Sequence, residues 1–463
     1  MIEEPKLIEV DSYGCQQAFF SERKERKMRV KAIFISGLVA ATALLQAQNL
    51  DIVAEKQQTW KVGEEIPFTV SAREKNGKLY KDGAVTLSFL NCGDRKIKDD
   101  LTIDLSKGNP AKFSVKLDHP GFILVKASKY RGRDGNEVAW KNKPFAPLGG
   151  AGVEPEKIRP GLECPADFDS FWQAGLKEFK NAAIEVTPAP DVQRKNFKIS
   201  RITVKFPDGA GIVSGYLSLP EKPGKYPALA GVPGAACVSG YPFGPKPHWS
   251  SPVPAIELHV NVHNFQVPVG AKEQKAAFKR YTRSLGCAYH FSNASQRDKY
   301  FFRNVWLAVS RAIDYVTALP EYDGRHFAAA GNSQGGGTAL VLGGLNKNIT
   351  CVVASVPALC DHGGWKLGRQ AGWPQVHKSL NGKADEAMRY FDAAFFAARI
   401  RVPTLVSVGF VDVTCSPSSV YSAYNLIPAG VPKRIFPMYR SGHSGCREFN
   451  KEVSKFLRTE LTR

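Results

Sequence analysis

The sequence predicts two folded units, a small all-β sandwich followed by a larger α/β unit with a mostly parallel sheet. Two patterns predict this division. Between residues 50 and 147, short alternating apolar runs are separated by turn signals, as in an antiparallel sandwich. From residue 153 onward, strand-like apolar runs alternate with helical periodicity, as in a parallel sheet covered on both faces. The chain has 463 residues, more than one typical core organises, which agrees with two units.

The first unit, residues 50–147, is expected to be an immunoglobulin-like β-sandwich. Nothing in it indicates catalysis, and its aromatic residues serve either its core or a carbohydrate-binding surface. A Pro-, Gly- and Ala-rich stretch at 144–152 is the expected linker to the second unit, residues 153–463. The strand-like runs of the first unit lie at 66–70, 84–89, 101–105, 111–115 and 122–125.

The second unit carries apolar runs that are typical of buried strands. These runs lie at 211–219, 226–232, 256–262, 327–330, 351–355, 404–408 and 434–437. A helix is expected before Pro320, because apolar residues recur there at steps of three and four on one face. They are Phe302, Val305, Val309, Ile313 and Val316.

The first 47 residues, 1–47, have the layout of a leader with a secretory signal peptide. Arg29 and Lys31 precede an apolar run at 32–45 that ends among small residues. This run is short for a membrane span, so we expect export to the periplasm or the medium without stable membrane insertion after cleavage. An uncleaved anchor is the alternative. Met28 is a candidate for the true start of the chain.

The formal net charge is +20, and a basic surface can attract an acidic polysaccharide, an anionic membrane or nucleic acid. No nucleic-acid-binding fold signature accompanies the charge, so nucleic acid is not an expected partner, and a solubilising surface explains the charge most simply. Nine cysteines are present. Disulfides are permitted in an exported protein, and Cys415 with Cys446 is a candidate pair that stays open.

A Gly-x-Ser-x-Gly element at Gly331–Gly335 lies between an apolar run and a helix of small residues. This layout is that of a nucleophile elbow, in which a serine occupies a sharp turn between strand and helix. The glycines allow the turn to pack closely against its neighbours. The sequence therefore predicts an α/β-hydrolase fold with Ser333 as nucleophile.

A serine nucleophile needs a base within reach and an acid that orients the base. In α/β-hydrolases the chain order is serine, acid, histidine. His443 alone among the histidines lies beyond the last expected strand, and Asp412 follows the apolar run 404–410. We therefore predict Asp412 and His443 as the acid and base, with Asp361, which also follows a strand-like run, as the alternative acid.

These motifs together resemble the acetyl xylan esterase and cephalosporin C deacetylase family, carbohydrate esterase family seven. The resemblance rests on Gly331–Gly337, on Asp412–Ser419 with Tyr421–Asn425, and on the loop around His443, and it extends from about Pro165 to the C-terminus. It implies an esterase that removes acetyl groups from sugar hydroxyls without a cofactor or metal. It also places nucleophile, acid and base on Ser333, Asp412 and His443.

The oxyanion hole is expected to use the backbone N–H groups of Gln334 and Ala235. Members of the family typically carry a tyrosine where this chain has Ala235. Their Arg-Gly-Gln element falls near Val262–Gln266, and their His-Glu pair falls where this chain has His443 followed by Ser444. Because this chain lacks both the arginine and the glutamate of these elements, no buried charge is left unpaired. Whether the chain forms the ring-shaped homo-oligomer that the resemblance implies stays open.

The sequence thus predicts an exported serine esterase that deacetylates carbohydrate of the xylan type, with an acetylated carbohydrate as its partner. Two alternatives remain open. The same residues serve hydrolysis of another ester or of a peptide bond. The other alternative is a carbohydrate-binding relic without activity, which the intact set of serine, aspartate and histidine disfavours. The segment 265–295 is the expected loop wall of the substrate pocket.

Overall fold

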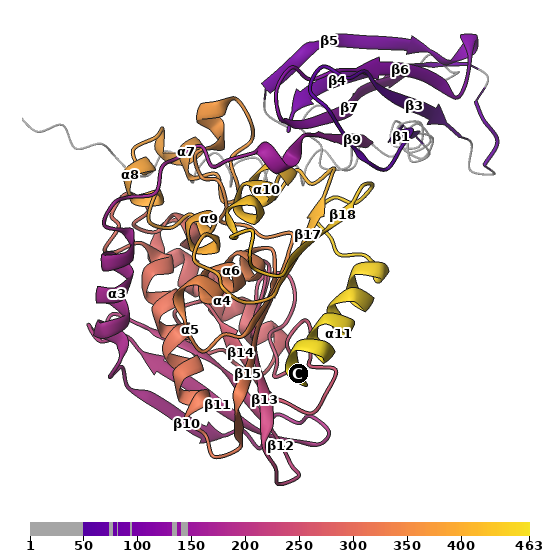
Figure 1. Cartoon of the computed structure of the whole chain (residues 1–463). Coiled ribbons are helices and arrows are strands. Elements are labelled where there is room, and N and C mark those ends of the chain that lie inside the picture. The colour runs from indigo at the N-terminus through magenta and orange to yellow at the C-terminus, as the bar shows by residue number, and fades with distance from the viewer. Residues whose placement is uncertain (1–49, 74–76, 81, 93–94, 132–136, 140–146) are drawn as a thin grey trace, which may run out of the picture.

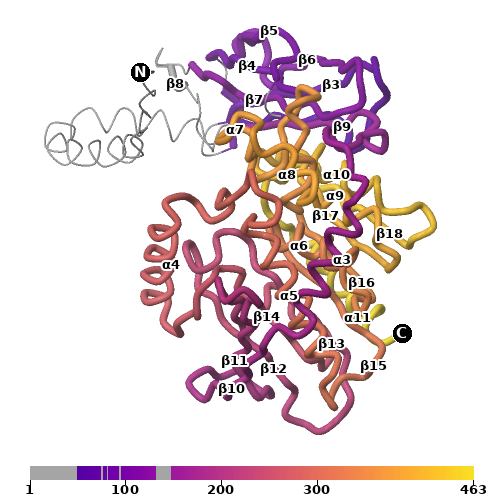
Figure 2. The backbone as a smooth tube through the Cα atoms, turned by 90° about the vertical axis from the view of Figure 1, so that its left-hand side faces the viewer, coloured from indigo at the N-terminus to yellow at the C-terminus, as the bar shows by residue number. Residues whose placement is uncertain are grey.

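A computed structural model describes residues 50–463 except 74–76, 81, 93–94, 132–136 and 140–146. A β-sandwich sits on one end of a larger α/β unit (Figure 1). The view turned by 90° shows the sandwich at the end opposite strands β10–β12 (Figure 2). The expected signal peptide lies outside the described residues. Within the described part of the chain, no helix combines the length and apolar character needed to cross a membrane.

The N-terminal unit consists of two sheets that enclose an apolar core. Strand β4 (Ala84–Asn91) shows why its run forms a strand: its side chains alternate between buried and partly buried positions, so one face covers the core. Across the core, Phe89 meets Phe113 edge to face at 5.9 Å. One sheet has the order β1 (Leu50–Ala54), β3 (Ile66–Ala72) and β6 (Ala111–Val115). The other has the order β2 (Thr59–Trp60), β9 (Leu148–Val153), β7 (Gly121–Arg131), β4 and β5 (Arg95–Asp104), and β8 (Glu137–Ala139) pairs with β7. The predicted all-β character is confirmed, and an immunoglobulin-like topology stays a prediction.

Part of the expected linker is instead a strand. Strand β9 pairs antiparallel with β7 and parallel with β2, so the sandwich sheet continues to Val153. Its glycines allow close packing: a Cβ atom at Gly149 would lie 2.8 Å from the carbonyl oxygen of Ile52, and one at Gly150 would lie 2.3 Å from that of Phe410. Glycines that look like linker residues in the sequence therefore bring backbones together here.

The C-terminal unit is built on a nine-stranded sheet. All strands expected from the sequence are present, and the neighbours from β14 to β18 are parallel, as predicted. Two antiparallel strands at one edge were not predicted, because their charged and apolar residues alternate and no continuous apolar run marks them. The sheet order is β10 (Ile184–Pro188), β11 (Phe197–Lys205), β12 (Ile212–Pro220), β14 (Ile256–Asn261), β13 (Tyr226–Val232), β15 (Tyr322–Asn332), β16 (Cys351–Ser355), β17 (Thr404–Gly409) and β18 (Lys433–Met438).

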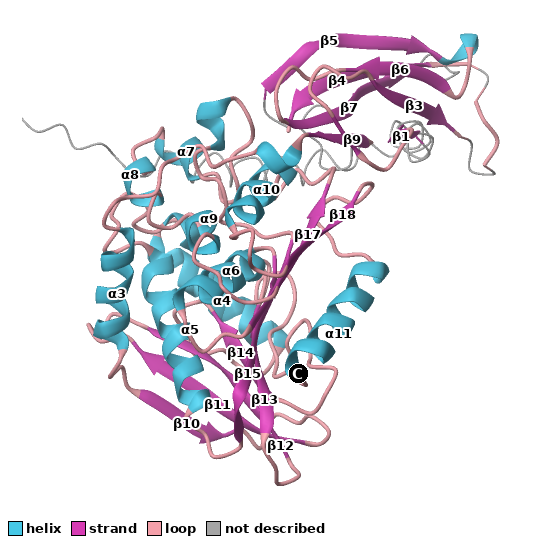
Figure 3. Cartoon of the chain, in the orientation of Figure 1, coloured by secondary structure: helices cyan, strands magenta, loops and turns pink. Residues whose placement is uncertain are grey.

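Helices cover both faces of this sheet (Figure 3). Helix α11 (Arg447–Leu461) packs on one face, against β15 and β17. The other face carries α3 (Phe168–Phe179), the predicted helix α5 (Phe301–Thr317) and α6 (Gln334–Leu345). Between β16 and β17 lie α7 (Val376–Leu380), α8 (Asp385–Met388) and α9 (Ala393–Ala397), and α10 (Pro417–Leu426) follows β17. Helix α6 is buried on nearly every side, which explains why its sequence holds almost no polar residue.

Candidate active site

The Gly-x-Ser-x-Gly element forms a sharp turn from β15 into α6. Ser333 lies between the last residue of the strand and the first of the helix, with φ 58° and ψ −120°. A serine with positive φ is strained, so the surroundings must hold it in place. Its N–H donates to the carbonyl of Ser355 at 2.9 Å, and its own carbonyl accepts from Gly337 at 3.0 Å and from Ala358 at 2.9 Å. The bonds with Ser355 and Ala358 tie the turn to the end of β16 and to the segment that follows it.

The flanking glycines let this turn pack against backbone. A Cβ atom at Gly331 would lie 2.2 Å from the carbonyl oxygen of Gly335. A Cβ atom at Gly335 would lie 1.9 Å from the carbonyl oxygen of Val232, at the end of β13. Neither position accommodates a side chain without moving main chain. The predicted nucleophile elbow is thus present in its backbone geometry.

His443 lies in the loop between β18 and α11 and reaches Ser333. Its Nε2 atom is 2.8 Å from the Ser333 Oγ atom, and its Nδ1 atom is 2.8 Å from Oδ2 of Asp412. With the Nδ1–H group donating to the carboxylate, Nε2 accepts the serine hydroxyl. The His443 side chain is 25 % exposed, so this end of the arrangement faces solvent, where an ester can approach.

Asp412 lies on the loop that follows β17, at the carboxyl end of the parallel sheet. Its side chain has no exposed surface. The Oδ1 atom accepts hydrogen bonds from the backbone N–H groups of Thr414, at 2.8 Å, and Cys415, at 2.9 Å. These two bonds satisfy one carboxylate oxygen and leave the other for His443.

Asp361, the alternative acid, lies elsewhere. Its Oδ1 atom accepts from the N–H group of Gly161 at 2.7 Å, and its Oδ2 atom accepts from Nε of Arg369 at 2.9 Å. Burial raises the pKa of this carboxyl, against the effect of Arg369. Asp361 therefore belongs to a buried ion pair, and the structure brings Asp412 to His443 instead.

The two cysteines considered as a disulfide pair are both free. Cys446 precedes α11, where its sulfur accepts the N–H of Phe449 at 3.4 Å. Cys415 is fully buried and lies within hydrogen-bonding reach of the Ser333 hydroxyl, and burial raises the pKa of its thiol well above the usual range. It therefore stays a neutral thiol behind the nucleophile. The sequence offers Cys415 as a disulfide candidate and gives no sign of this contact with Ser333.

The predicted oxyanion donors flank the elbow. Gln334 is the first residue of α6, so its backbone N–H group has no acceptor within the helix. Its side chain is buried, and Oε1 accepts the Tyr289 hydroxyl at 2.5 Å. Ala235 is half-buried in the loop after β13. That loop is adjacent to the nucleophile, because a Cβ atom at Gly234 would lie 3.7 Å from Cβ of Ser333. Donation by the Ala235 N–H remains a prediction.

The segment 265–295 is not the loop that was expected. It contains α4 (Ala271–Leu285), with charged residues on its exposed side. Tyr289, near its end, reaches Gln334, so the segment does approach the elbow. The amphipathic pattern of α4 is the signal that could have revealed this helix in the sequence.

The region at Val262–Gln266, near which the resemblance expects an Arg-Gly-Gln element, contains a buried histidine. His263 has no exposed surface and meets the rings of Phe278 and Tyr289 edge to face at 4.9 Å and 4.7 Å. Burial lowers its pKa to about 3, so the ring is neutral. A neutral ring among aromatic side chains needs no acidic partner, which fits a serine at position 444.

Comparisons with known proteins agree with this arrangement. A family model described as acetyl xylan esterase (AXE1) matches residues 154–460. The acetyl esterase Axe7A of Xylanibacter ruminicola is 32% identical over 432 residues, which cover 89% of this chain and 92% of that protein.

Two solved structures share the fold. Acetyl xylan esterase 1 from a Thermoanaerobacterium species has a TM-score of 0.53 and 21% identity, and the match covers 67% of this chain and 98% of that chain. An acetyl xylan esterase from a Paenibacillus species has a TM-score of 0.53 and 22% identity, with 66% and 99% covered. They confirm the predicted α/β-hydrolase fold. The family model spans more than half of the chain and includes the elbow and the loops of Asp412 and His443. The chain therefore belongs to the acetyl xylan esterase (AXE1) family of carboxylic ester hydrolases.

Proposed function

We propose that this esterase removes acetyl groups from acetylated carbohydrate of the xylan type, with Ser333, His443 and Asp412 as its catalytic triad. The observation that carries the proposal is the unbroken hydrogen-bond chain from Ser333 Oγ through both nitrogens of His443 to Asp412. The substrate class rests on the family and on the acetyl esterase that is 32% identical over most of the chain.

In the acylation step, the Ser333 Oγ atom attacks the acetyl carbonyl carbon while its proton passes to Nε2 of His443. Asp412 holds the ring in the required tautomer and stabilises the imidazolium that forms. The tetrahedral intermediate then collapses, the bond to the sugar oxygen breaks, and His443 returns the proton to that oxygen. The products of this step are the free sugar hydroxyl and an acetyl group on Ser333.

In the deacylation step, His443 takes a proton from water, and the resulting hydroxide attacks the acetyl-enzyme. Collapse of the second intermediate releases acetate and restores the Ser333 hydroxyl with the proton held by His443. In both steps the negative charge on the carbonyl oxygen is stabilised by the N–H groups of Gln334 and Ala235. The position of Gln334 at the start of α6 supports this role, because free N–H groups at a helix start favour an anion.

The substrate class is tested by measuring product release by the full chain on four substrates in parallel. They are acetylated xylo-oligosaccharides, an aryl acetate, an aryl butyrate and a peptide anilide. We expect acetate release from the first two. Turnover of aryl acetate with none on any acetylated glycan would contradict the substrate class. Faster cleavage of the peptide anilide than of the oligosaccharide ester would favour a peptidase instead.

We also propose that the protein is exported after cleavage of a signal peptide near Ala47. The basic residues and apolar run of the leader support this proposal. N-terminal sequencing of protein recovered from the periplasm or the medium is expected to begin near Gln48. Recovered protein that begins near Met1 would show that no such cleavage occurs.

A further inference from the structure

The N-terminal sandwich contacts the α/β unit at the loops that carry the proposed acid and base. In Figure 1 it lies over the ends of β17 and β18 and over α10. Asp412 and His443 follow these two strands. A domain that only binds polysaccharide has no need to touch these loops.

The closest contact is between β9 and the acid loop. A Cβ atom at Gly150 would lie 2.3 Å from the carbonyl oxygen of Phe410, 3.0 Å from its carbonyl carbon and 3.1 Å from Cγ1 of Val411. Phe410 and Val411 immediately precede Asp412 in the chain. Strand β9 therefore lies directly against the backbone that leads into the acid, at a distance only glycine permits.

A second contact buries a sandwich side chain in the core of the α/β unit. Phe122, on β7, has no exposed surface and belongs to the large apolar core of the C-terminal unit. Its ring meets Phe410 edge to face at 5.0 Å and Tyr421, on α10, at 5.5 Å. The residue that starts the acid loop is thus fixed by a ring and by a strand of the sandwich.

The loop that carries His443 is bonded to the acid loop and to the sandwich. The N–H group of Val411 donates to the carbonyl of Ser441, two residues before His443, at 3.2 Å. Arg440 in turn forms an ion pair with Asp51 on β1, with N–O distances of 2.8 Å and 2.6 Å. Both side chains of this pair are about half exposed, so it adds little on its own. The contact of the base loop with the acid loop is the stronger connection.

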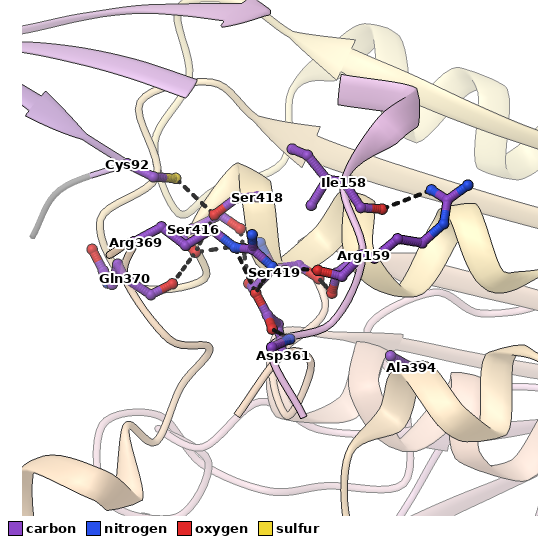
Figure 4. A network of polar contacts seen from close by, with 12 residues as sticks. Cys92, Ile158, Arg159, Asp361, Arg369, Gln370, Ala394, Ser416, Ser418 and Ser419 are labelled. Carbon is purple, nitrogen blue, oxygen red and sulfur yellow. Dashed lines mark hydrogen bonds and ion pairs between the residues drawn. The ribbon is translucent and has the colours of Figure 1, made fainter. Parts of the chain in front are cut away.

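A polar network holds the far side of the acid loop (Figure 4). The Ser418 hydroxyl donates to the sulfur of Cys92, at the end of β4, at 3.0 Å. Gln370 donates from Nε2 to the carbonyl of Val413 at 2.7 Å and accepts the Ser416 hydroxyl at 3.1 Å. The residues on either side of Asp412 are therefore fixed, by the sandwich and by the segment around Gln370.

We propose that the N-terminal sandwich is a positioning element of the catalytic centre, with Gly150 and Phe122 as positioning residues for Asp412. By fixing the acid loop, the sandwich keeps the carboxylate at the distance from His443 that holds the ring in its working tautomer. This inference rests on the proposed triad. It assigns the sandwich a role in turnover itself, even for a small ester that makes no contact with it.

The test compares Gly150→Ala with Gly108→Ala in the full chain, using an aryl acetate. Gly108 is a matched control in the same sandwich, where a Cβ atom would meet nothing within 4 Å. We expect Gly150→Ala to lower kcat by about 10- to 100-fold, because displacing a catalytic group by about 1 Å has effects of this size. KM is expected to stay within about twofold, since the loop of Asp412 acts on the chemical step. Gly108→Ala is expected to match the wild type in both constants.

Phe122→Leu provides the second variant, in case the alanine at position 150 prevents folding. It removes the ring against Phe410 without adding atoms, and it is expected to lower kcat with KM unchanged. Wild-type kcat in folded Phe122→Leu, or in folded Gly150→Ala, would overturn the positioning role. So would a loss confined to acetylated xylan with normal turnover of aryl acetate, which is the result expected of a binding module.

The proposed function is checked separately in the same assay. Wild-type turnover of aryl acetate that does not depend on Ser333 would refute the triad itself. Turnover that depends on Ser333 but is unchanged by both sandwich variants would refute the positioning role alone.

Discussion

Replacing Ser333 with alanine is expected to lower kcat for aryl acetate by about 10⁵- to 10⁶-fold, the loss typical of removing a triad serine. The change deletes the oxygen atom that carries the acetyl group in the proposed mechanism. The residual rate would come from binding and from the oxyanion donors. Alanine fits the site, because it is smaller than serine and adopts the same strained φ of 58° at similar cost. Acetate release under saturating substrate measures the effect.

Ser422→Ala is a matched control for this change. Ser422 is also buried, and its hydroxyl donates only to a carbonyl one turn earlier in α10, at 2.7 Å. Activity within about threefold of wild type is expected for this control, because one neutral hydrogen bond contributes little. Both variants should unfold cooperatively close to the wild-type midpoint. Acetate release that persists in folded Ser333→Ala would refute the proposed mechanism.

The residues of the proposed triad could be predicted because each has a local sequence pattern. The elbow needs glycines beside Ser333, where a Cβ atom would meet backbone. His443 is the one histidine of the sequence that follows the last strand. The acid was harder to identify, since Asp412 and Asp361 both follow buried strands. Sheet order decides between them: β17 lies next to β18, whose loop carries His443, and β16 does not. Strand order is a long-range property that no local pattern records.

The contacts of the sandwich could not be predicted for the same reason. The glycines of β9 resemble a linker until their neighbours, Ile52 and Phe410, are known. The sequence offers Cys415 and Cys446 as a candidate disulfide pair, and a hydrogen bond from Val411 to Ser441 joins the loops that carry them. The two sulfurs nevertheless have separate environments, one beside Ser333 and one at the start of α11. Proximity of loops does not determine the direction of side chains.

Replacing Asp412 with asparagine is expected to lower kcat by about 10⁴-fold, although the shape of the site is kept. The backbone N–H groups of Thr414 and Cys415 require an acceptor at the position of Oδ1. The amide oxygen of the asparagine must occupy that position, which turns its NH₂ group toward Nδ1 of His443. Nδ1 then has to accept, so the ring proton moves to Nε2 and faces the Ser333 hydroxyl. A base that already carries a proton there cannot take one from the serine.

Asp361→Asn separates this effect from the general loss of a buried carboxylate. It leaves Arg369, whose side chain is 9 % exposed, without its charge partner, and such a loss costs about 3–5 kcal/mol of stability. The folded fraction of this variant should retain kcat within about tenfold, because its hydrogen bonds do not reach His443. Asp361→Asn is therefore expected to lose more stability, measured by denaturant unfolding. Asp412→Asn is expected to lose more kcat, measured on the folded enzyme. A larger fall in kcat for Asp361→Asn than for Asp412→Asn would assign the acid to Asp361 and would require the loop after β16, rather than the loop after β17, to orient the histidine during turnover.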